Sequence, residues 1–274
     1  MSDKKIGLAL GSGAARGIAH IGVLQVLEKE GIPVDMIAGT SAGAVVGALY
    51  ARGLTPGRLK TLATELRWLR LAPLVDLVLP RTGLIGGKKI EDWFKSLIGN
   101  RVSFSELNIP FACVATDIMT GEEVVVDEGL VIDGVRASIS IPGIFTVVKR
   151  DDRYLVDGGL VNPVPASILK KMGADYIIAV NVLPDITKRD RGHWIDQNKT
   201  RGSKEPNVFH ILMQSVYIGT HSLTKSCLKN ADIAIKPRVA HIGPADFQLA
   251  EDCIIQGKLA AQEAIPKIKK HLSA

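Results

Sequence analysis

Residues 6–51 read IGLALGSGAARGIAHIGVLQVLEKEGIPVDMIAGTSAGAVVGALYA, and this stretch decides the fold. Two short apolar runs, 6–10 and 36–38, each lead into a glycine-rich turn and then into a segment with helical spacing, 14–30 and 44–51. A short apolar run before a turn is typical of a buried strand. Strands that alternate with helices form parallel sheets, so the stretch predicts an α/β fold with crossover helices.

The rest of the chain continues this alternation. Helices are expected at 56–69, 88–98, 131–140, 164–172, 208–229 and 246–271, and strands at 111–116, 123–126, 146–149, 154–156, 176–180 and 233–235. Residues 71–87 are apolar but broken by Pro and Gly, which predicts an irregular segment, and the polar residues 184–206 predict a mobile loop. A strand follows that loop, so we expect one domain over 1–274, with 207–274 as its C-terminal helical part.

Composition narrows the class of protein. The 274 residues are 46% hydrophobic, 23% charged and only 5% aromatic, which fits a globular chain and argues against nucleobase stacking. A chain of this size buries enough surface to fold without a metal or disulfide staple. Three scattered cysteines form neither a zinc cluster nor a disulfide framework, and they indicate a reducing compartment.

The charge balance is basic, with 34 Lys and Arg against 28 Asp and Glu, a net charge of +6. Such a surplus suits nucleic acid, an anionic membrane or anionic substrates, or it is an ordinary basic surface, because no long basic run occurs. The sequence shows no signal peptide, and no run approaches 18 apolar residues. We therefore expect a cytoplasmic protein.

The strongest chemical signal is a serine on a sharp turn, Gly39-x-Ser41-x-Gly43. In a nucleophile elbow, the serine lies between a strand and a helix, and the flanking glycines let the two backbones approach closely. That context is predicted here, which makes Ser41 a candidate nucleophile. The alternative is an ordinary glycine-rich turn with a solvated serine.

A second glycine-rich turn, residues 11–17, joins the first predicted strand to the first predicted helix. Backbone N–H groups at a helix start can hold a phosphate or a developing oxyanion. As a dinucleotide fingerprint the turn is weak, because Arg16 replaces the last glycine, and Asp35 precedes the second strand instead of ending it. A nucleotide-binding module is the lesser alternative.

A serine nucleophile also needs a base. Asp157-Gly158-Gly159 follows the predicted strand 154–156, which exposes Asp157 at a strand end, although an ordinary Asp-Gly turn has the same sequence. Among the six histidines, His20 is expected in the core. A triad would place its histidine after Ser41, which leaves candidates open. These candidates are His210, His221 and His241.

Taken together, four segments resemble the patatin-like phospholipase family, specifically its small bacterial members. They are residues 11–17, 39–43, 137–143 and 157–165, and their order and separations match over residues 5–182. The resemblance implies a three-layer α/β/α fold with a mainly parallel central sheet. It also implies a serine acyl hydrolase, a lipid esterase similar to phospholipase A, that needs no cofactor or metal.

The resemblance implies roles for single residues as well. Ser41 would be the nucleophile and Asp157 the base of a dyad without a catalytic histidine. The oxyanion hole would come from the N–H groups of Gly13, Ala14 and Ala15. Supporting positions would be Gly11, Ser12, Arg16 and Gly17 in the loop, and Gly39, Gly43, Gly158 and Gly159 in the turns of the elbow and the dyad.

The glycine-rich loop departs from the family pattern, Gly-Gly-Gly-x-Arg/Lys-Gly. This chain reads Ser-Gly-Ala-Ala-Arg-Gly over residues 12–17. The backbone donors survive the change, and only a positive φ at Ser12 or Ala14 would be strained, by about 1–2 kcal/mol. Arg16 would anchor the loop or face a lipid phosphate, with a surface arginine as the alternative.

The expected partners are an acyl-ester lipid and, peripherally, an anionic membrane at its inner, cytoplasmic face. Leu69–Pro80 is apolar and irregular, so it could cover an acyl chain, enter a lipid interface or pack on the core. Net positive charge favours anionic lipid, and we expect no nucleic-acid partner. A binding or regulatory protein that kept the fold without the rate is a further alternative.

Overall fold

The structure is a computed structural model that describes residues 4–65, 76, 82–185 and 208–273, apart from the side chains of residues 209 and 210. Within these residues, one sheet has the strand order β10-β9-β1-β2-β4-β8-β7, with β5 paired to β4. The strands are β1 (Ile6–Leu10), β2 (Met36–Thr40), β4 (Phe111–Asp117), β5 (Glu123–Val126), β7 (Val148–Arg150), β8 (Arg153–Asp157), β9 (Tyr176–Val180) and β10 (Ile233–Ile235). Neighbouring strands from β10 to β4 pair in parallel. The pairs β4–β5, β4–β8 and β8–β7 are antiparallel.

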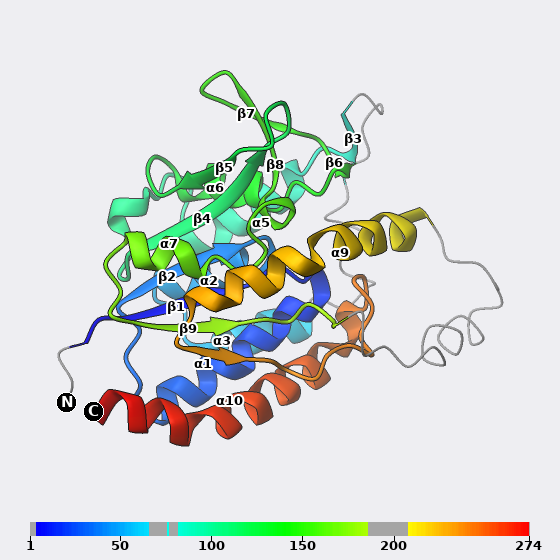
Figure 1. The fold of residues 1–274 in the computed structure, drawn as a ribbon. Helices are drawn as coiled ribbons and strands as arrows, with labels where there is room; N and C mark the ends of the chain where they lie inside the picture. Colours follow the sequence, from blue (N-terminus) through cyan, green and yellow to red (C-terminus); the bar gives the residue numbers. More distant parts are fainter. Residues whose placement is uncertain (1–3, 66–75, 77–81, 186–207, 274) are drawn as a thin grey trace.

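Helices cover both faces of the sheet, with α9 crossing one side of it and α1 and α10 lying together on the other (Figure 1). The first face carries α1 (Ala19–Lys29), α2 (Ala42–Ala51), α3 (Pro56–Glu65), α5 (Lys88–Ile98), α6 (Val131–Ser138) and α10 (Ala250–Ser273). The second face carries α7 (Ala166–Lys171) and α9 (Val208–Cys227). The predicted three-layer α/β/α architecture with a mainly parallel sheet is therefore confirmed.

The strand residues divide between two cores because successive side chains point to opposite faces. Leu8 and Leu10 belong to the core under α1 and α10, whereas Ala9 belongs to the core under α7 and α9. Ala9 lies in register with the alanines of its neighbours, which form a row of small side chains across the sheet. The row consists of Ala234, Ala179, Ala9, Ala38 and Ala112.

Several boundaries differ from the prediction. The first helical segment begins with a 3₁₀ turn, Ala14–Ile18, and α1 follows it. Ala14, at the start of the turn, has a φ of 50°, so the regular helix begins later than the spacing predicts. Helix α2 begins at Ala42, two residues early, since Ser41 itself forms the turn. A short two-stranded sheet of β3 (Gly83–Ile85) and β6 (Gly143–Phe145) was not predicted.

Some expectations concern residues outside the described part of the chain. The loop 184–206 lies there except for its first two residues, and so does Leu69–Pro80 except for Asp76. None of the helices in the described ranges combines the length and the apolar character that crossing a bilayer requires.

Helix α10 joins the C-terminal part of the chain to the rest by crossing α1 at two glycines. A Cβ on Gly22 would lie 2.0 Å from the carbonyl oxygen of Ile254, and one on Gly257 would lie 2.0 Å from that of Ala19. The two backbones therefore touch, and neither position has room for a methyl group.

We expect Gly22→Ala to lower the free energy of unfolding by about 2–3 kcal/mol, because the added methyl group must push α10 away from α1. Gly219→Ala in α9 is the matched control, because a Cβ there meets nothing within 4 Å. It should raise the stability by about 0.5–1 kcal/mol, the usual gain for Gly→Ala within a helix. Urea unfolding measures both, and an unchanged midpoint for Gly22→Ala would contradict the close crossing.

Candidate active site

Ser41 occupies the turn between β2 and α2 in a strained conformation, with φ 55° and ψ −120°. Two glycines allow the surrounding backbones to approach. A Cβ on Gly43 would lie 2.0 Å from the carbonyl oxygen of Leu10, and one on Gly39 would lie 2.6 Å from that of Gly43. The strand–turn–helix context and the strained serine are those of a nucleophile elbow.

The structure brings Ser41 and Asp157 together. The Ser41 hydroxyl donates to Asp157 Oδ2 over 2.5 Å, and the N–H of Gly159 donates to Asp157 Oδ1 over 2.7 Å. Asp157 is the last residue of β8, and its carbonyl oxygen accepts from the Thr116 hydroxyl at 2.9 Å. Both carboxylate oxygens are thus held, and the carboxylate has one fixed orientation toward the serine.

Burial changes the acidity of this carboxyl group. Asp157 is 6% exposed. Loss of water raises the pKa of Asp157 to about 6, although the hydrogen bonds from Ser41 and Gly159 lower it. A carboxylate with this pKa is a stronger base than an ordinary aspartate and is still ionised at neutral pH.

The last residue of α6 and the segment after it fix the backbone of both residues. The N–H of Ser41 donates to Ser138 Oγ, and the N–H of Asp157 donates to the Ser140 carbonyl oxygen, both over 2.9 Å. Sequence reasoning used residues 137–143 for the family resemblance but assigned no role to these two serines. The signal that could have identified them is that both lie in the family segment 137–143, which precedes the segment that contains Asp157.

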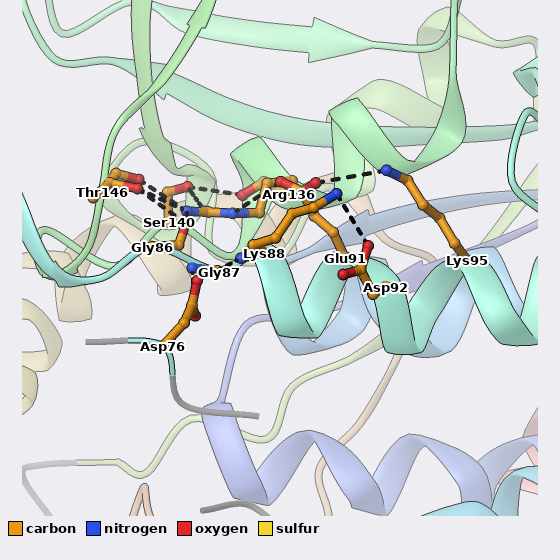
Figure 2. Close-up of polar contacts among 10 residues, drawn as sticks. All are labelled: Asp76, Gly86, Gly87, Lys88, Glu91, Asp92, Lys95, Arg136, Ser140 and Thr146. Atoms are coloured by element: carbon orange, nitrogen blue, oxygen red, sulfur yellow. Dashed lines mark hydrogen bonds and ion pairs between the residues drawn. The ribbon is translucent and has the colours of Figure 1, made fainter. Parts of the chain in front are cut away.

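Arg136 connects this segment to the small sheet (Figure 2). Its guanidinium is almost fully buried and donates to Ser140 Oγ over 2.5 Å and to the Gly86 carbonyl oxygen over 2.7 Å. It also donates to the Thr146 carbonyl oxygen over 3.2 Å and lies 3.8 Å from Glu91. Sequence reasoning missed Arg136, because its partners come from three separate segments of the chain.

The glycine-rich loop uses some of its N–H groups for its own support. Gly11 donates to Val180, Ser12 to Pro163, and Ala15 to Pro244, each to a carbonyl oxygen. Among the described residues, the N–H groups of Gly13 and Ala14 have no partner. Ala14 lines the same cavity as Ser41. Its φ is positive, so its backbone is strained where the family pattern has a glycine.

Two buried polar side chains, Arg16 and His20, lie within or next to the glycine-rich loop. Arg16 is 2% exposed and lies 5.3 Å above the ring of Tyr217, so it is not a surface arginine. His20 is fully buried, with Nε2 2.8 Å from the Gly11 carbonyl oxygen, and burial lowers its pKa to about 4. His20 is therefore a neutral core histidine, as expected.

The other glycines named from the sequence also stand at close contacts. A Cβ on Gly17 would lie 2.4 Å from that of Ala42 at the start of α2, and one on Gly158 would lie 2.2 Å from the Val114 carbonyl oxygen. Gly159 supplies the N–H bond to Asp157. The loop, the elbow and the dyad turn thus meet in one place.

Histidines do not line the cavities that contain Ser41, as far as side chains are described. His241 Nε2 is 2.6 Å from Asp252, and His221 Nε2 is 3.8 Å from Asp185. His193 and the side chain of His210 lie outside the described part of the chain. Nor do three or more His, Cys, Asp or Glu side chains gather into a metal-binding group within the described ranges.

Two cavities meet at Ser41. A small one of about 20 Å³, room for about one water, lies between the dyad and α9, where Met213 and Tyr217 cover it. A larger one of about 240 Å³ extends to the other side. It is apolar and is lined by side chains of α1, α2, α3 and α5, by Ile139, Ile141 and Phe145, and by Phe247.

The fold and the site are those of an α/β/α protein in which Ser41, on a nucleophile elbow, donates a hydrogen bond to the buried Asp157. The model of the family described as patatin-like phospholipase matches residues 8–170. The chain belongs to the patatin-like phospholipase family.

Curated relatives agree with this assignment. An uncharacterized NTE family protein of Mycobacterium tuberculosis is 38% identical over 66% of this chain and 50% of its own length. The lysophospholipase NTE1 of Debaryomyces hansenii is 31% identical over 90% of this chain and 17% of its own length. The chain thus spans half or less of the length of these relatives.

One solved structure shares the fold. VipD from Legionella pneumophila matches with a TM-score of 0.55 and 13% identity, over 97% of this chain and 67% of that chain. At this identity the likeness concerns the fold alone.

Burial of Asp157 predicts a pH-dependent stability. Its folded pKa of about 6 exceeds the ordinary value of 3.8, so the folded state binds the proton more tightly and stability falls as pH rises through that window. Between pH 4 and pH 7.5 the wild type should lose about 2–3 kcal/mol that Asp157→Asn retains. Urea unfolding of both proteins at both pH values checks this, and equal losses would contradict a raised pKa.

Proposed function

We propose that this protein is a serine acyl hydrolase, a lipid esterase similar to phospholipase A, that uses Ser41 and Asp157 as its catalytic dyad. The observation that carries the proposal is the 2.5 Å hydrogen bond between the elbow serine and the buried carboxylate, at the mouth of an apolar cavity. A hydroxyl held against a base, beside a space for an acyl chain, suits attack on an ester carbonyl.

In the first step, Ser41 Oγ attacks the acyl carbonyl carbon while Asp157 takes the hydroxyl proton. The N–H groups of Gly13 and Ala14 stabilise the oxyanion, and removal of one such donor typically costs about 3 kcal/mol. The ester C–O bond then breaks, and Asp157 returns the proton to the departing alcohol. The acyl group remains on Ser41.

In the second step, a water molecule gives a proton to Asp157 and attacks the acyl-enzyme. Collapse of that intermediate releases the fatty acid and returns the proton to Ser41. Asp157 needs no histidine between itself and the serine, because its raised pKa already brings its basicity near neutral pH. Its fixed bond from Gly159 keeps it oriented through both steps.

The apolar cavity accounts for the acyl part of the substrate. Val45, Leu49, Leu62 and Trp93 are among the side chains that line it, and such a surface binds alkyl chains by removing them from water. The name of the fungal relative, a lysophospholipase, supports a lipid with a single acyl chain as the substrate. A cytoplasmic protein that meets anionic membranes peripherally would reach such lipids.

The loop contacts favour ester hydrolysis over nucleotide binding. A phosphate cradle needs several free N–H groups that converge, but Gly11, Ser12 and Ala15 use theirs within the fold. Two remaining donors, at Gly13 and Ala14, suit one oxyanion. A regulatory protein without enzymatic activity would not need the hydrogen bond between Ser41 and Asp157. Labelling by a fluorophosphonate distinguishes such a protein from a hydrolase.

Ser41→Ala should abolish both hydrolysis of p-nitrophenyl butyrate and labelling by a fluorophosphonate, since both require the activated hydroxyl. Ser226→Ala, at an exposed serine of α9, is the matched control and should keep both. Turnover or labelling that persists in Ser41→Ala would refute the assignment of the nucleophile.

The pH dependence of kcat/KM tests the base. Because Asp157 must be ionised to accept a proton and its pKa is about 6, kcat/KM should rise with pH around a midpoint near 6 and level off above it. His241→Gln should leave the midpoint in place. A midpoint that moves with a histidine variant would favour a triad instead.

A further inference from the structure

A third cavity lies along α9, and the proposed function has not used it. It measures about 440 Å³ and is bounded by α9, by residues 181–185 after β9 and by residues 236–240 after β10. Its basic side chains are His221, Lys225, Lys236 and Arg238, and Asp185 is the acidic residue that lines it. We call it the basic cavity.

The basic cavity adjoins the small cavity at the dyad. Leu183 and Tyr217 line both. His221 and Lys225 follow Tyr217 by one and two turns of α9, which places them about 6 and 12 Å farther along the helix axis. This spacing matches the length of a short linker, such as glycerol, between an ester carbonyl at Ser41 and a charged group in the basic cavity.

The basic cavity carries a surplus of positive charge. Within the described residues, neither Lys225 nor Lys236 has an ion pair, and both are exposed at its rim. Arg238 lies 3.7 Å from Glu263, whose charge offsets its own, so the surplus rests on the two lysines. Asp185 lies 3.8 Å from His221. Cations around a concave surface reinforce one another and attract anions.

The three cavities form a sequence that matches an amphiphilic ester. The apolar cavity lies on one side of Ser41, the dyad is in the middle, and the basic cavity follows on the side of α9. In such an ester, the acyl chain and the charged head group lie on opposite sides of the carbonyl group. With the carbonyl at Ser41, the acyl chain would lie in the apolar cavity and the head group in the basic cavity.

We propose that the basic cavity binds the phosphate-bearing head group of the substrate and selects lipids whose head group carries a net negative charge. This inference rests on the proposed function, because it places the ester carbonyl at Ser41. A head group with a phosphate and no cation gains from Lys225 and Lys236, whereas a choline group would bring its own positive charge against them.

A general attraction of basic residues to anionic membranes would act differently. Every exposed lysine would contribute to it, and it would vanish for substrates dissolved as monomers. Lys170 and Lys229 are exposed lysines that line none of the three cavities. Replacing these two removes the same charge and serves as the matched control.

The test compares Lys225→Gln/Lys236→Gln with Lys170→Gln/Lys229→Gln on short-chain lysophosphatidylglycerol and lysophosphatidylcholine below their micelle concentrations. We expect the cavity variant to raise KM for the anionic substrate about five- to tenfold. Its KM for the choline substrate and the KM values of the control should stay within about twofold. Equal changes for both substrates, the same change in the control, or no change would overturn the proposal.

A binding measurement keeps this result separate from failure of the proposed function. If the wild type neither hydrolyses p-nitrophenyl butyrate nor reacts with the fluorophosphonate, the proposed function fails. In that case, or if it hydrolyses neither lysolipid, the basic cavity is judged by ligand binding alone. Glycerol 3-phosphate should then raise the melting temperature of Ser41→Ala and not that of Ser41→Ala with both cavity lysines replaced. Equal melting shifts in the two proteins would reject the head-group site.

Discussion

A carboxylate held away from water against a hydroxyl is the interaction on which the site depends. Asp157 would be costly to bury as an ion without compensation, and the fold supplies hydrogen bonds from the Ser41 hydroxyl and the Gly159 N–H. The bond between the Asp157 N–H and the Ser140 carbonyl oxygen fixes the same residue through its backbone. The result is a base with a raised pKa and a single orientation.

Much of the surrounding structure serves to hold that pair in place. Ser138 holds the N–H of Ser41, and Arg136 holds Ser140 through its hydroxyl. Arg136 also donates to the carbonyl oxygen of Gly86, the residue after β3 (Figure 2). Arg136 also lies over the ring of Phe145, which lines the apolar cavity, so the Ser41–Asp157 pair and that cavity are connected through this side chain.

The sequence predicted the parts of this structure that depend on local pattern. The strand Ile6–Leu10 and the helix Lys88–Ile98 have the predicted bounds, because strand runs and helical spacing are local signals. Ser41 could be picked out because an elbow has a short motif. Asp157 gained its weight only from the family resemblance, since an Asp-Gly turn alone is common.

The remaining features depend on contacts between distant segments. Nothing local in the sequence distinguishes Arg136 from a surface arginine, and its burial follows from partners at Gly86 and Thr146. The direction of the Ala15 N–H toward Pro244 likewise depends on where the C-terminal part of the chain packs. The basic cavity joins residues after β9, after β10 and on α9, which no linear motif reveals.

The row of alanines across the sheet makes its two faces unequal. Apolar burial stabilises by about 25 cal/mol per Å², and Ala9, Ala38 and their neighbours offer α7 and α9 less area than Leu8 and Leu10 offer the opposite layer. Burial of apolar area on the sheet therefore contributes less to holding the layer of α7 and α9 than to holding the layer on the opposite face.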